Sequence, residues 1–166
     1  MRPGDLTATY SCPDCGTGPE LDHGRPRYQL HGASAGFSPA LSLSLSRSRG
    51  WALLAAGALT PAATVGIDLE HSSRVGFPGF DDVALTPAER QLLAVLPPNQ
   101  ADPWRTAVWA RKEALLKARG TGLRLDPCSV EAFGEPTDGA VLVELDTAAL
   151  GLPAGFAAAL AVVGPA

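Results

Sequence analysis

The sequence has few lysines, few cysteines and no long apolar run, and each shortage excludes a class of protein. Only two of its 13 basic residues are lysines and the formal net charge is −4, so it lacks the basic face of a general nucleic-acid binder. Its three cysteines are an odd number, which argues against a disulfide framework. No stretch of about 18 apolar residues exists, so the sequence predicts no membrane span.

Aromatic residues are also scarce, at 6% of the chain, so we expect a core of small side chains. The N-terminal residues MRPGDLTATYSCPDCG lack the apolar segment of a signal peptide, which predicts a cytoplasmic protein. A length of 166 residues is enough for one ordinary domain without a disulfide or a metal to stabilise it.

Alternation and turn residues predict several strands. Residues 41–47 alternate leucine and serine, as a strand with one apolar face does. Gly50 separates them from a second apolar run at 51–58, which favours a hairpin over a helix. We also predict a strand at 64–70, and shorter ones at 7–10, 27–30, 128–133, 140–145 and 156–163.

Two helices follow the strand at 64–70. Thr86, Pro87 and Glu89 suit an N-cap, a first helical position and a capping box, and this helix should end before Pro97. Asp102-Pro103 should begin the second helix in the same way, and Gly120 should terminate it near Arg119. The order of strands, two helices and strands predicts an α+β fold, with a mostly antiparallel sheet packed against helices.

Asp68 and Glu70 lie two residues apart on the predicted strand at 64–70. Alternation places both on one face, with Cα atoms roughly 6.6–7 Å apart, so that their carboxylates can share one hard cation. Gly66, on the same face, leaves room beside them for a ligand. Taken alone, the pair also fits a solvated outer face, which is the commoner use of acidic residues in strands.

The second predicted helix carries the complementary residues. Trp109, Glu113 and Lys117 are spaced i, i+4 and i+8 and stack on one side, and Lys112 adjoins Glu113. Alone, the helix fits an ordinary amphipathic helix with a Glu–Lys pair. Three carboxylates from two elements, with two lysines, match what phosphoryl chemistry needs, because Mg²⁺ prefers oxygen ligands and ammonium groups neutralise a leaving phosphate.

These segments together resemble the signature of the 4′-phosphopantetheinyl transferases. The family pattern is a G-[IV]-D-x-E strand, an F-x-x-E segment and a W-x-x-K-E-A-x-x-K helix. The residues that match it are Gly66, Asp68, Glu70, Trp109, Lys112, Glu113, Ala114 and Lys117, and Glu89 matches the glutamate of the middle segment.

The upstream sequence resembles the larger, surfactin-synthetase-activating branch of that family. Gly24-Arg25-Pro26 is similar to its G-[KR]-P segment, which binds coenzyme A. Ser46-Arg47-Ser48 is similar to its S-H-S segment, whose serine and histidine contact the nucleotide phosphates; here Arg47 replaces the histidine, and arginine also binds phosphate.

That branch has two similar halves, and this chain is shorter than two. The resemblance therefore implies that residues 1–60 are a remnant of the N-terminal half that carries the segments contacting coenzyme A. Residues 61–166 would be the C-terminal transferase half with the metal site. Weak affinity for coenzyme A, or self-association of two chains, would follow from the shortened first half.

The resemblance implies transfer of 4′-phosphopantetheine from coenzyme A to a serine of an apo acyl or peptidyl carrier protein. Asp68, Glu70 and Glu113 would bind Mg²⁺, and Glu113 would accept the serine proton. Lys117 and Lys112 would stabilise the leaving 3′,5′-ADP. The residues that would bind coenzyme A are Gly24, Arg25, Pro26, Ser46, Arg47 and Lys117.

Three alternatives remain open at this point. Cys12, Cys15 and His23 could hold zinc with a fourth ligand such as Cys128, since a structural zinc site needs four ligands. The carboxylates and lysines could serve a magnesium-dependent phosphodiesterase or nuclease. Finally, a shortened, non-catalytic homologue could bind carrier proteins without modifying them.

Overall fold

The computed structural model describes residues 6–12, 15–18, 20, 25–30, 40–59, 63–134, 136 and 139–164 of the chain. Its strands are β1 (Leu6–Cys12), β2 (Gly16–Gly18), β3 (Arg25–Leu30), β4 (Ala40–Ser48), β5 (Trp51–Leu59), β6 (Thr64–His71), β7 (Val141–Leu145) and β8 (Phe156–Val163). Its helices are α1 (Phe80–Ala84), α2 (Pro87–Ala94) and α3 (Pro98–Arg119), with 3₁₀ turns at Ser72–Arg74, Gly122–Arg124 and Pro127–Ser129.

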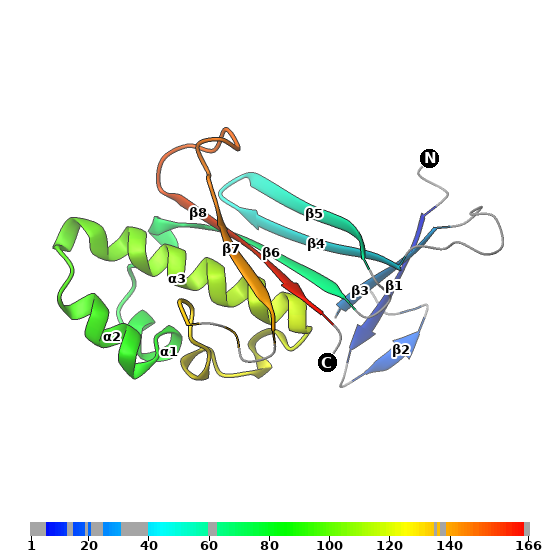
Figure 1. The fold of residues 1–166 in the computed structure, drawn as a ribbon, viewed down its shortest axis with the longest axis horizontal. Helices are drawn as coiled ribbons and strands as arrows, with labels where there is room; N and C mark the ends of the chain where they lie inside the picture. Colours follow the sequence, from blue (N-terminus) through cyan, green and yellow to red (C-terminus); the bar gives the residue numbers. More distant parts are fainter. Residues whose placement is uncertain are drawn as a thin grey trace.

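Within these ranges the strands form three antiparallel sheets, with the orders β2-β1-β3, β4-β5 and β6-β8-β7. The long helix α3 packs along β6 and β8 (Figure 1), so one face of the third sheet is covered by a helix. The predicted α+β class with antiparallel sheets is therefore confirmed, as are the predicted strands at 7–10, 27–30, 140–145 and 156–163.

The β4–β5 hairpin forms as predicted, with a two-residue turn at Arg49 and Gly50. Both residues have positive φ angles, 51° and 83°, as the tight turns that suit twisted hairpins require. The serine face of β4 turns inward: the Val65 and Ile67 amides of β6 donate to Ser42 Oγ at 2.9 Å and Ser44 Oγ at 3.0 Å. These hydroxyls satisfy amides on the edge of the β6-β8-β7 sheet, where β4 lies beside β6 without pairing to it through backbone hydrogen bonds.

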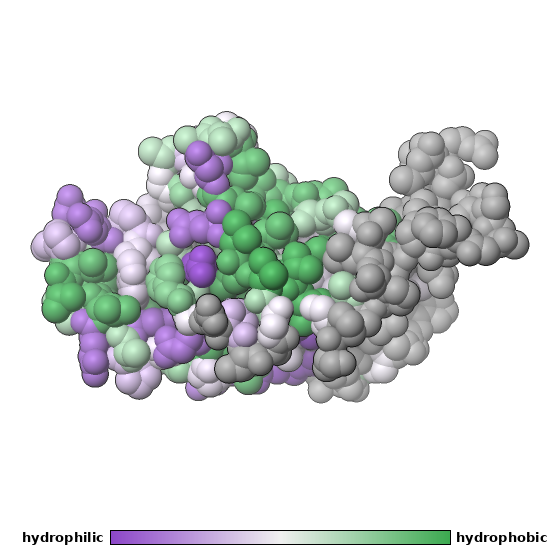
Figure 2. All heavy atoms as spheres, in the orientation of Figure 1, coloured by the Kyte–Doolittle hydropathy of each residue, from purple (hydrophilic) through white to green (hydrophobic). Residues whose placement is uncertain are grey.

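The opposite face of the hairpin is apolar and largely uncovered. Leu45 and Leu54 on this face are 44% and 64% exposed, and Val141 and Val143 of β7 are exposed as well. Figure 2 shows hydrophobic residues gathered over the central strands on the side of the molecule that it presents. Apolar surfaces of this kind often mark interaction sites, but self-association remains a prediction.

Two predicted elements differ from the structure. Helix α3 begins at Pro98 and not at Asp102, because Pro98 also suits a first helical position and Pro103 removes only one hydrogen bond. The predicted strand at 128–133 is wrong. Pro127–Ser129 form a 3₁₀ turn capped by the Asp126 side chain, and the Ala132 amide donates to Glu89 Oε1 at 2.8 Å and not to a neighbouring strand.

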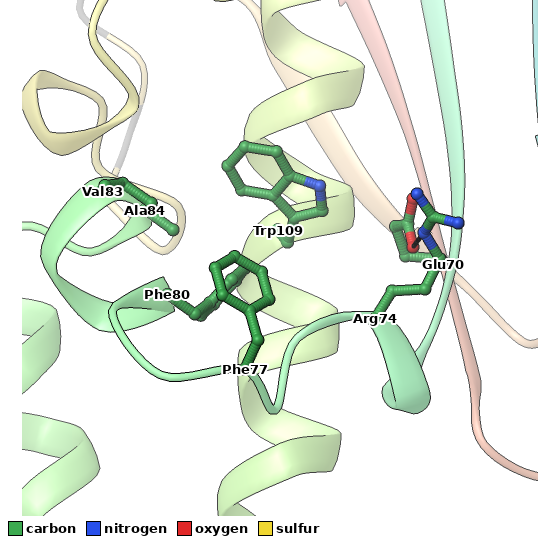
Figure 3. A pocket seen from close by; sticks show the side chains of 7 residues that line it. All are labelled: Glu70, Arg74, Phe77, Phe80, Val83, Ala84 and Trp109. Carbon is green, nitrogen blue, oxygen red and sulfur yellow. Dashed lines mark ion pairs between the residues drawn. The ribbon is translucent and has the colours of Figure 1, made fainter.

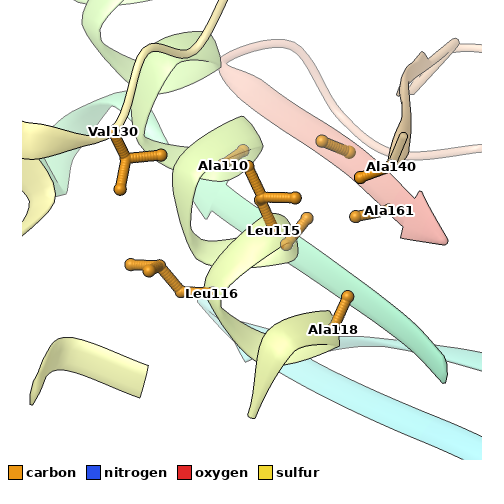
Figure 4. Packing of buried hydrophobic residues seen from close by; sticks show 9 residues of the cluster. Ala110, Leu115, Leu116, Ala118, Val130, Ala140 and Ala161 are labelled. Atoms are coloured by element: carbon orange, nitrogen blue, oxygen red, sulfur yellow. The ribbon is translucent and has the colours of Figure 1, made fainter. Parts of the chain in front are cut away.

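Small side chains form the core between α3 and the third sheet, as the low aromatic content suggests. Ala110, Ala114 and Ala118 of α3 pack with Ala159 and Ala161 of β8, and Leu115, Leu116, Val130 and Ala140 complete the cluster (Figure 4). Alanine at the contact lets the helix axis approach the strands closely. This close approach brings the polar side chains of α3 and β6 within reach of one another.

Replacing Gly66 with alanine should separate α3 from β6. A Cβ atom at Gly66 would overlap the Ala114 carbonyl oxygen and the Ala118 amide nitrogen of α3, and backbone atoms cannot move aside as a side chain can. We expect a loss of about 3 kcal/mol in the free energy of unfolding, measured in urea. Gly76→Ala is the control, because a Cβ there would meet only the Asp102 carboxylate at an ordinary 3.5 Å; an equal loss in both variants would contradict the prediction.

Within the described part of the chain, none of the helices is both long enough and apolar enough to cross a membrane.

Candidate active site

The polar face of β6 and one side of α3 bring Asp68, Glu70, Glu113 and Lys117 near one another. The Lys117 ammonium contacts Asp68 Oδ1 at 2.5 Å and donates to the Ile67 carbonyl at 3.3 Å. Asp68 also influences both glutamates electrostatically. Gly66 packs against α3 on the same face of the strand, which allows this convergence.

The two oxygens of Asp68 have different surroundings. Oδ1 accepts hydrogen bonds from Ser46 Oγ at 2.8 Å and from Lys117 Nζ. Oδ2 is buried and has no hydrogen-bond partner among the described residues, although Asp68 is only 3% exposed. A buried carboxylate oxygen without a partner is costly and rare, so this atom is free to accept a hydrogen bond or to bind a cation.

Glu70 and Glu113 both have raised pKa values. For Glu70 burial raises the pKa and the Asp68 charge raises it further, while a hydrogen bond from the His71 amide and the charge of the exposed Arg74, at 3.8 Å, offset part of this. For Glu113 burial is again the largest cause, and Asp68 adds to it more than Lys117 subtracts. Three carboxylates thus face one lysine and the exposed Arg74, and the site carries an excess of negative charge.

These residues fit a magnesium ion in chemistry, although they do not enclose one by themselves. In the ranges that the structure describes, no three His, Cys, Asp or Glu side chains are arranged so that they could hold a metal ion. Mg²⁺ is commonly bound by one or two carboxylates plus substrate phosphates and water. The unpartnered Asp68 Oδ2 and the excess negative charge fit a site of that kind.

The raised pKa values predict how stability depends on pH in the metal-free protein. A group whose pKa is higher in the folded chain than its ordinary 4.5 stabilises the fold fully below that value, and the contribution is lost as pH rises through the raised pKa. We therefore expect wild type to lose more stability than Glu113→Gln over the pH range that begins at 4.5 and extends upward. Urea midpoints across this range test it; parallel curves would contradict it.

Lys112 lies in a different place from Lys117. Its side chain is 0% exposed and its Nζ contacts Glu89 Oε2 at 2.5 Å, the Ala84 carbonyl at 2.6 Å and the Pro127 carbonyl at 2.9 Å. Its three hydrogens are therefore used inside the protein. The sequence-based expectation that Lys112 stabilises a leaving phosphate does not agree with this placement, because the ammonium does not reach the carboxylate site.

Glu89 has a structural role, as the predicted capping box with Thr86 implied. Its Oε2 accepts from the Thr86 amide at 2.8 Å, and Thr86 Oγ1 accepts from the Glu89 amide, so the two form a capping box for α2. Its Oε1 accepts from Ala132. With Lys112, Glu89 therefore joins α1, α2, α3 and the segment after Pro127 into one buried cluster, which we call the Glu89–Lys112 clamp.

The residues expected to bind coenzyme A are only partly described. Gly24 and the side chains of Arg25 and Pro26 lie outside the described residues. Ser46 is buried against Asp68, a contact that sequence reasoning missed, and Arg47 is exposed on the opposite face of the hairpin. Their proposed roles toward coenzyme A stay predictions.

A cavity of about 180 Å³ adjoins Glu70 (Figure 3). Aromatic rings form much of its lining, which consists of Glu70, Arg74, Phe77, Phe80, Val83, Ala84 and Trp109. Phe80 contacts both Phe77 and Trp109 edge to face, and Phe77 is 53% exposed. Sequence reasoning singled out Trp109 and gave no role to the two phenylalanines, although a Phe-rich loop after the acidic strand belongs to the same resemblance.

The zinc alternative is not tested. The Cys12 side chain and His23 lie outside the described residues. Cys128, the suggested fourth ligand, donates from Sγ to the Asp82 carbonyl at 3.2 Å, which places it beside α1.

Comparison with known proteins relates this fold and site to one family. A solved holo-(acyl-carrier-protein) synthase from Bacillus anthracis str. Ames, in complex with CoA (3′,5′-ADP), aligns at a TM-score of 0.50 with 22% identity, over 61% of this chain and 96% of that one. The Thermotoga maritima holo-[acyl-carrier-protein] synthase aligns at 0.45 with 26% identity, over 61% and 63%. The first likeness shows a shared fold.

The sequence itself identifies the family. Residues 64–158 match the model of the 4′-phosphopantetheinyl transferase superfamily, and this range includes β6, α3 and the carboxylates. The chain belongs to the 4′-phosphopantetheinyl transferase superfamily. No curated protein matched the sequence.

Proposed function

We propose that this protein transfers 4′-phosphopantetheine from coenzyme A to a serine hydroxyl of an apo carrier protein, in a magnesium-dependent reaction. The observation that carries the proposal is the carboxylate site at β6 and α3, where Asp68 keeps one buried oxygen unpartnered beside two glutamates of raised pKa. Membership of the superfamily supplies the substrate class, since the solved relative holds 3′,5′-ADP of coenzyme A.

Asp68, Glu70 and Glu113 are the proposed ligands of the ion. Because the three carboxylates are not arranged to hold a metal by themselves, phosphate oxygens of coenzyme A and water would have to complete its coordination. Bound Mg²⁺ would neutralise the diphosphate of coenzyme A and polarise the phosphoryl group under attack. Because all three side chains come from two rigid elements, β6 and α3, the chain would fix the position of the diphosphate relative to the incoming serine.

Glu113 is the proposed general base. This role comes from the W-x-x-K-E-A-x-x-K resemblance, in which Glu113 is the glutamate. In the metal-free chain, burial and the Asp68 charge raise the pKa of Glu113. The serine oxygen forms a bond to the phosphorus that carries pantetheine, the bond from that phosphorus to the 3′,5′-ADP oxygen breaks, and the serine proton passes to a Glu113 carboxylate oxygen.

Lys117 is the proposed cation beside the departing 3′,5′-ADP, because its partly exposed ammonium lies at the carboxylate site. Lys112 is left out of the reacting groups, since it is fully buried in the Glu89–Lys112 clamp. Arg25 and Arg47 remain proposed phosphate ligands on the strength of the G-[KR]-P and S-H-S resemblance alone. That resemblance also supports placing the chain in the larger branch, with residues 1–60 as its N-terminal part.

The proposal is tested by incubating the purified protein with coenzyme A, Mg²⁺ and apo carrier proteins of the fatty-acid, polyketide and non-ribosomal peptide types. Mass spectrometry should show at least one carrier gaining a phosphopantetheine group, and chelating the metal should prevent the gain. Hydrolysis of coenzyme A without carrier modification would indicate a phosphodiesterase. Carrier binding without any mass gain would indicate a non-catalytic homologue.

A further inference from the structure

The inward face of β4 contacts β6 in two different ways. Ser42 and Ser44 accept from backbone amides of β6, so their side chains take the place of backbone pairing between β4 and β6. Ser46, the next residue on this face, departs from the pattern and donates to the Asp68 side chain at 2.8 Å. It is 7% exposed, so this hydrogen bond lies inside the protein.

This contact determines which oxygen of Asp68 is available. Ser46 Oγ and Lys117 Nζ both donate to Oδ1, and together they hold the carboxylate from two elements, β4 and α3. Oδ2 is left buried and without a partner. With both protein donors on Oδ1, the carboxylate has a preferred rotation, and Oδ2 is the oxygen left to accept from a ligand.

The same contact leaves Ser46 poorly suited to bind phosphate. A serine hydroxyl has one hydrogen to donate, and Ser46 gives it to Asp68. The Oγ lone pairs that remain would repel a phosphate oxygen. The role that the S-H-S resemblance implied for this serine, a direct contact to the nucleotide phosphates, therefore conflicts with its hydrogen bond.

We propose that Ser46 is a positioning residue: it orients the Asp68 carboxylate so that Oδ2 is available to the Mg²⁺ that binds together with coenzyme A. This rests on the proposed magnesium-dependent function. Through Ser46 the β4–β5 hairpin, which lies outside the residues matched to the family model, takes part in cation binding at β6. Partners that orient a metal ligand in this way typically affect metal affinity 10- to 100-fold.

The test is calorimetric titration of coenzyme A into the protein at a series of Mg²⁺ concentrations. In Ser46→Ala, the Mg²⁺ concentration at which coenzyme A affinity rises should increase about tenfold, while the affinity at saturating Mg²⁺ stays at the wild-type value. Ser46→Thr keeps the hydroxyl and should restore the wild-type midpoint. Ser46→Cys, of similar size with a weaker donor, should give an intermediate midpoint if the alanine variant fails to fold.

Ser44→Ala is the matched control. It removes the neighbouring hydroxyl and its hydrogen bond to the Ile67 amide, so it should lower the melting temperature without moving the Mg²⁺ midpoint. A Ser46→Ala variant that binds coenzyme A more weakly at every Mg²⁺ concentration, with the midpoint unchanged, would overturn the inference and restore a phosphate contact.

Failure of the inference and failure of the proposed function give different results. Wild-type protein that shows no magnesium-dependent binding of coenzyme A and modifies no carrier would refute the function. Wild-type protein that does both, with Ser46→Ala and wild type sharing one Mg²⁺ midpoint, would refute only the role of Ser46.

Discussion

Replacing Asp68 with asparagine should lower the rate of phosphopantetheine transfer by at least about a hundredfold. The proposed cation would lose a ligand, and the site would lose the negative charge of the carboxylate. Each interaction of this kind is worth several kcal/mol in the transition state. The amide is close in size to the carboxylate and can still accept from Ser46, so the fold should remain. Transfer is measured by mass spectrometry of the carrier protein, and folding by circular dichroism.

Asp82→Asn is the control for this variant. Asp82 belongs to α1 and its side chain is 81% exposed, in a weak 3.5 Å pair with Arg90. Losing that charge should leave transfer within about twofold of wild type, since exposed pairs contribute little. Full activity in Asp68→Asn would remove Asp68 from the metal site and with it the proposed mechanism.

Lys112→Met should cost about 3–5 kcal/mol of folding free energy, because it leaves the Glu89 carboxylate buried without its cation. It also leaves the Ala84 and Pro127 carbonyls without their donor. Loss of the Glu89–Lys112 clamp should therefore lower the urea midpoint sharply. We expect any loss of transfer to follow the loss of folded protein.

Arg90→Met serves as the comparison, because it also breaks an ion pair near α1. Its partner is Asp82, and this pair is exposed, whereas the pair of Lys112 is buried. Its folding free energy should stay within about 0.5 kcal/mol of wild type. If Lys112→Met were as stable as wild type yet inactive, the ammonium of Lys112 would have to be returned to the reacting groups.

Local features of the chain were predictable because they depend on neighbouring residues. The Arg49-Gly50 turn, the capping box of Thr86 and Glu89 and the placement of Asp68 and Glu70 on one strand face all follow from short-range backbone geometry. The prediction of a strand at 128–133 was wrong because the conformation there depends on a distant residue. The Ala132 amide donates to Glu89, 43 residues away, and no local pattern indicates this contact.

The two lysines of α3 show where sequence reasoning stopped. Positions five apart on a helix differ by about 140° in direction, so the side chains of Lys112 and Lys117 necessarily face different surroundings. The spacing of four already placed Lys117 beside Glu113. Whether that side of α3 met Asp68 and Glu70 depended on how α3 is rotated against β6, and the alanines of α3 and Gly66 set that rotation through their close contact.

The sequence alone determined the chemical groups at the site and the elements that carry them, since periodicity and caps act over a few residues. Only the tertiary structure decided the partners of those groups: Ser46 on Asp68, Lys117 at the carboxylates, and Lys112 buried with Glu89. The physical reason is that such contacts join residues distant in the chain, and the packing of helix against sheet, which no single segment specifies, selects them.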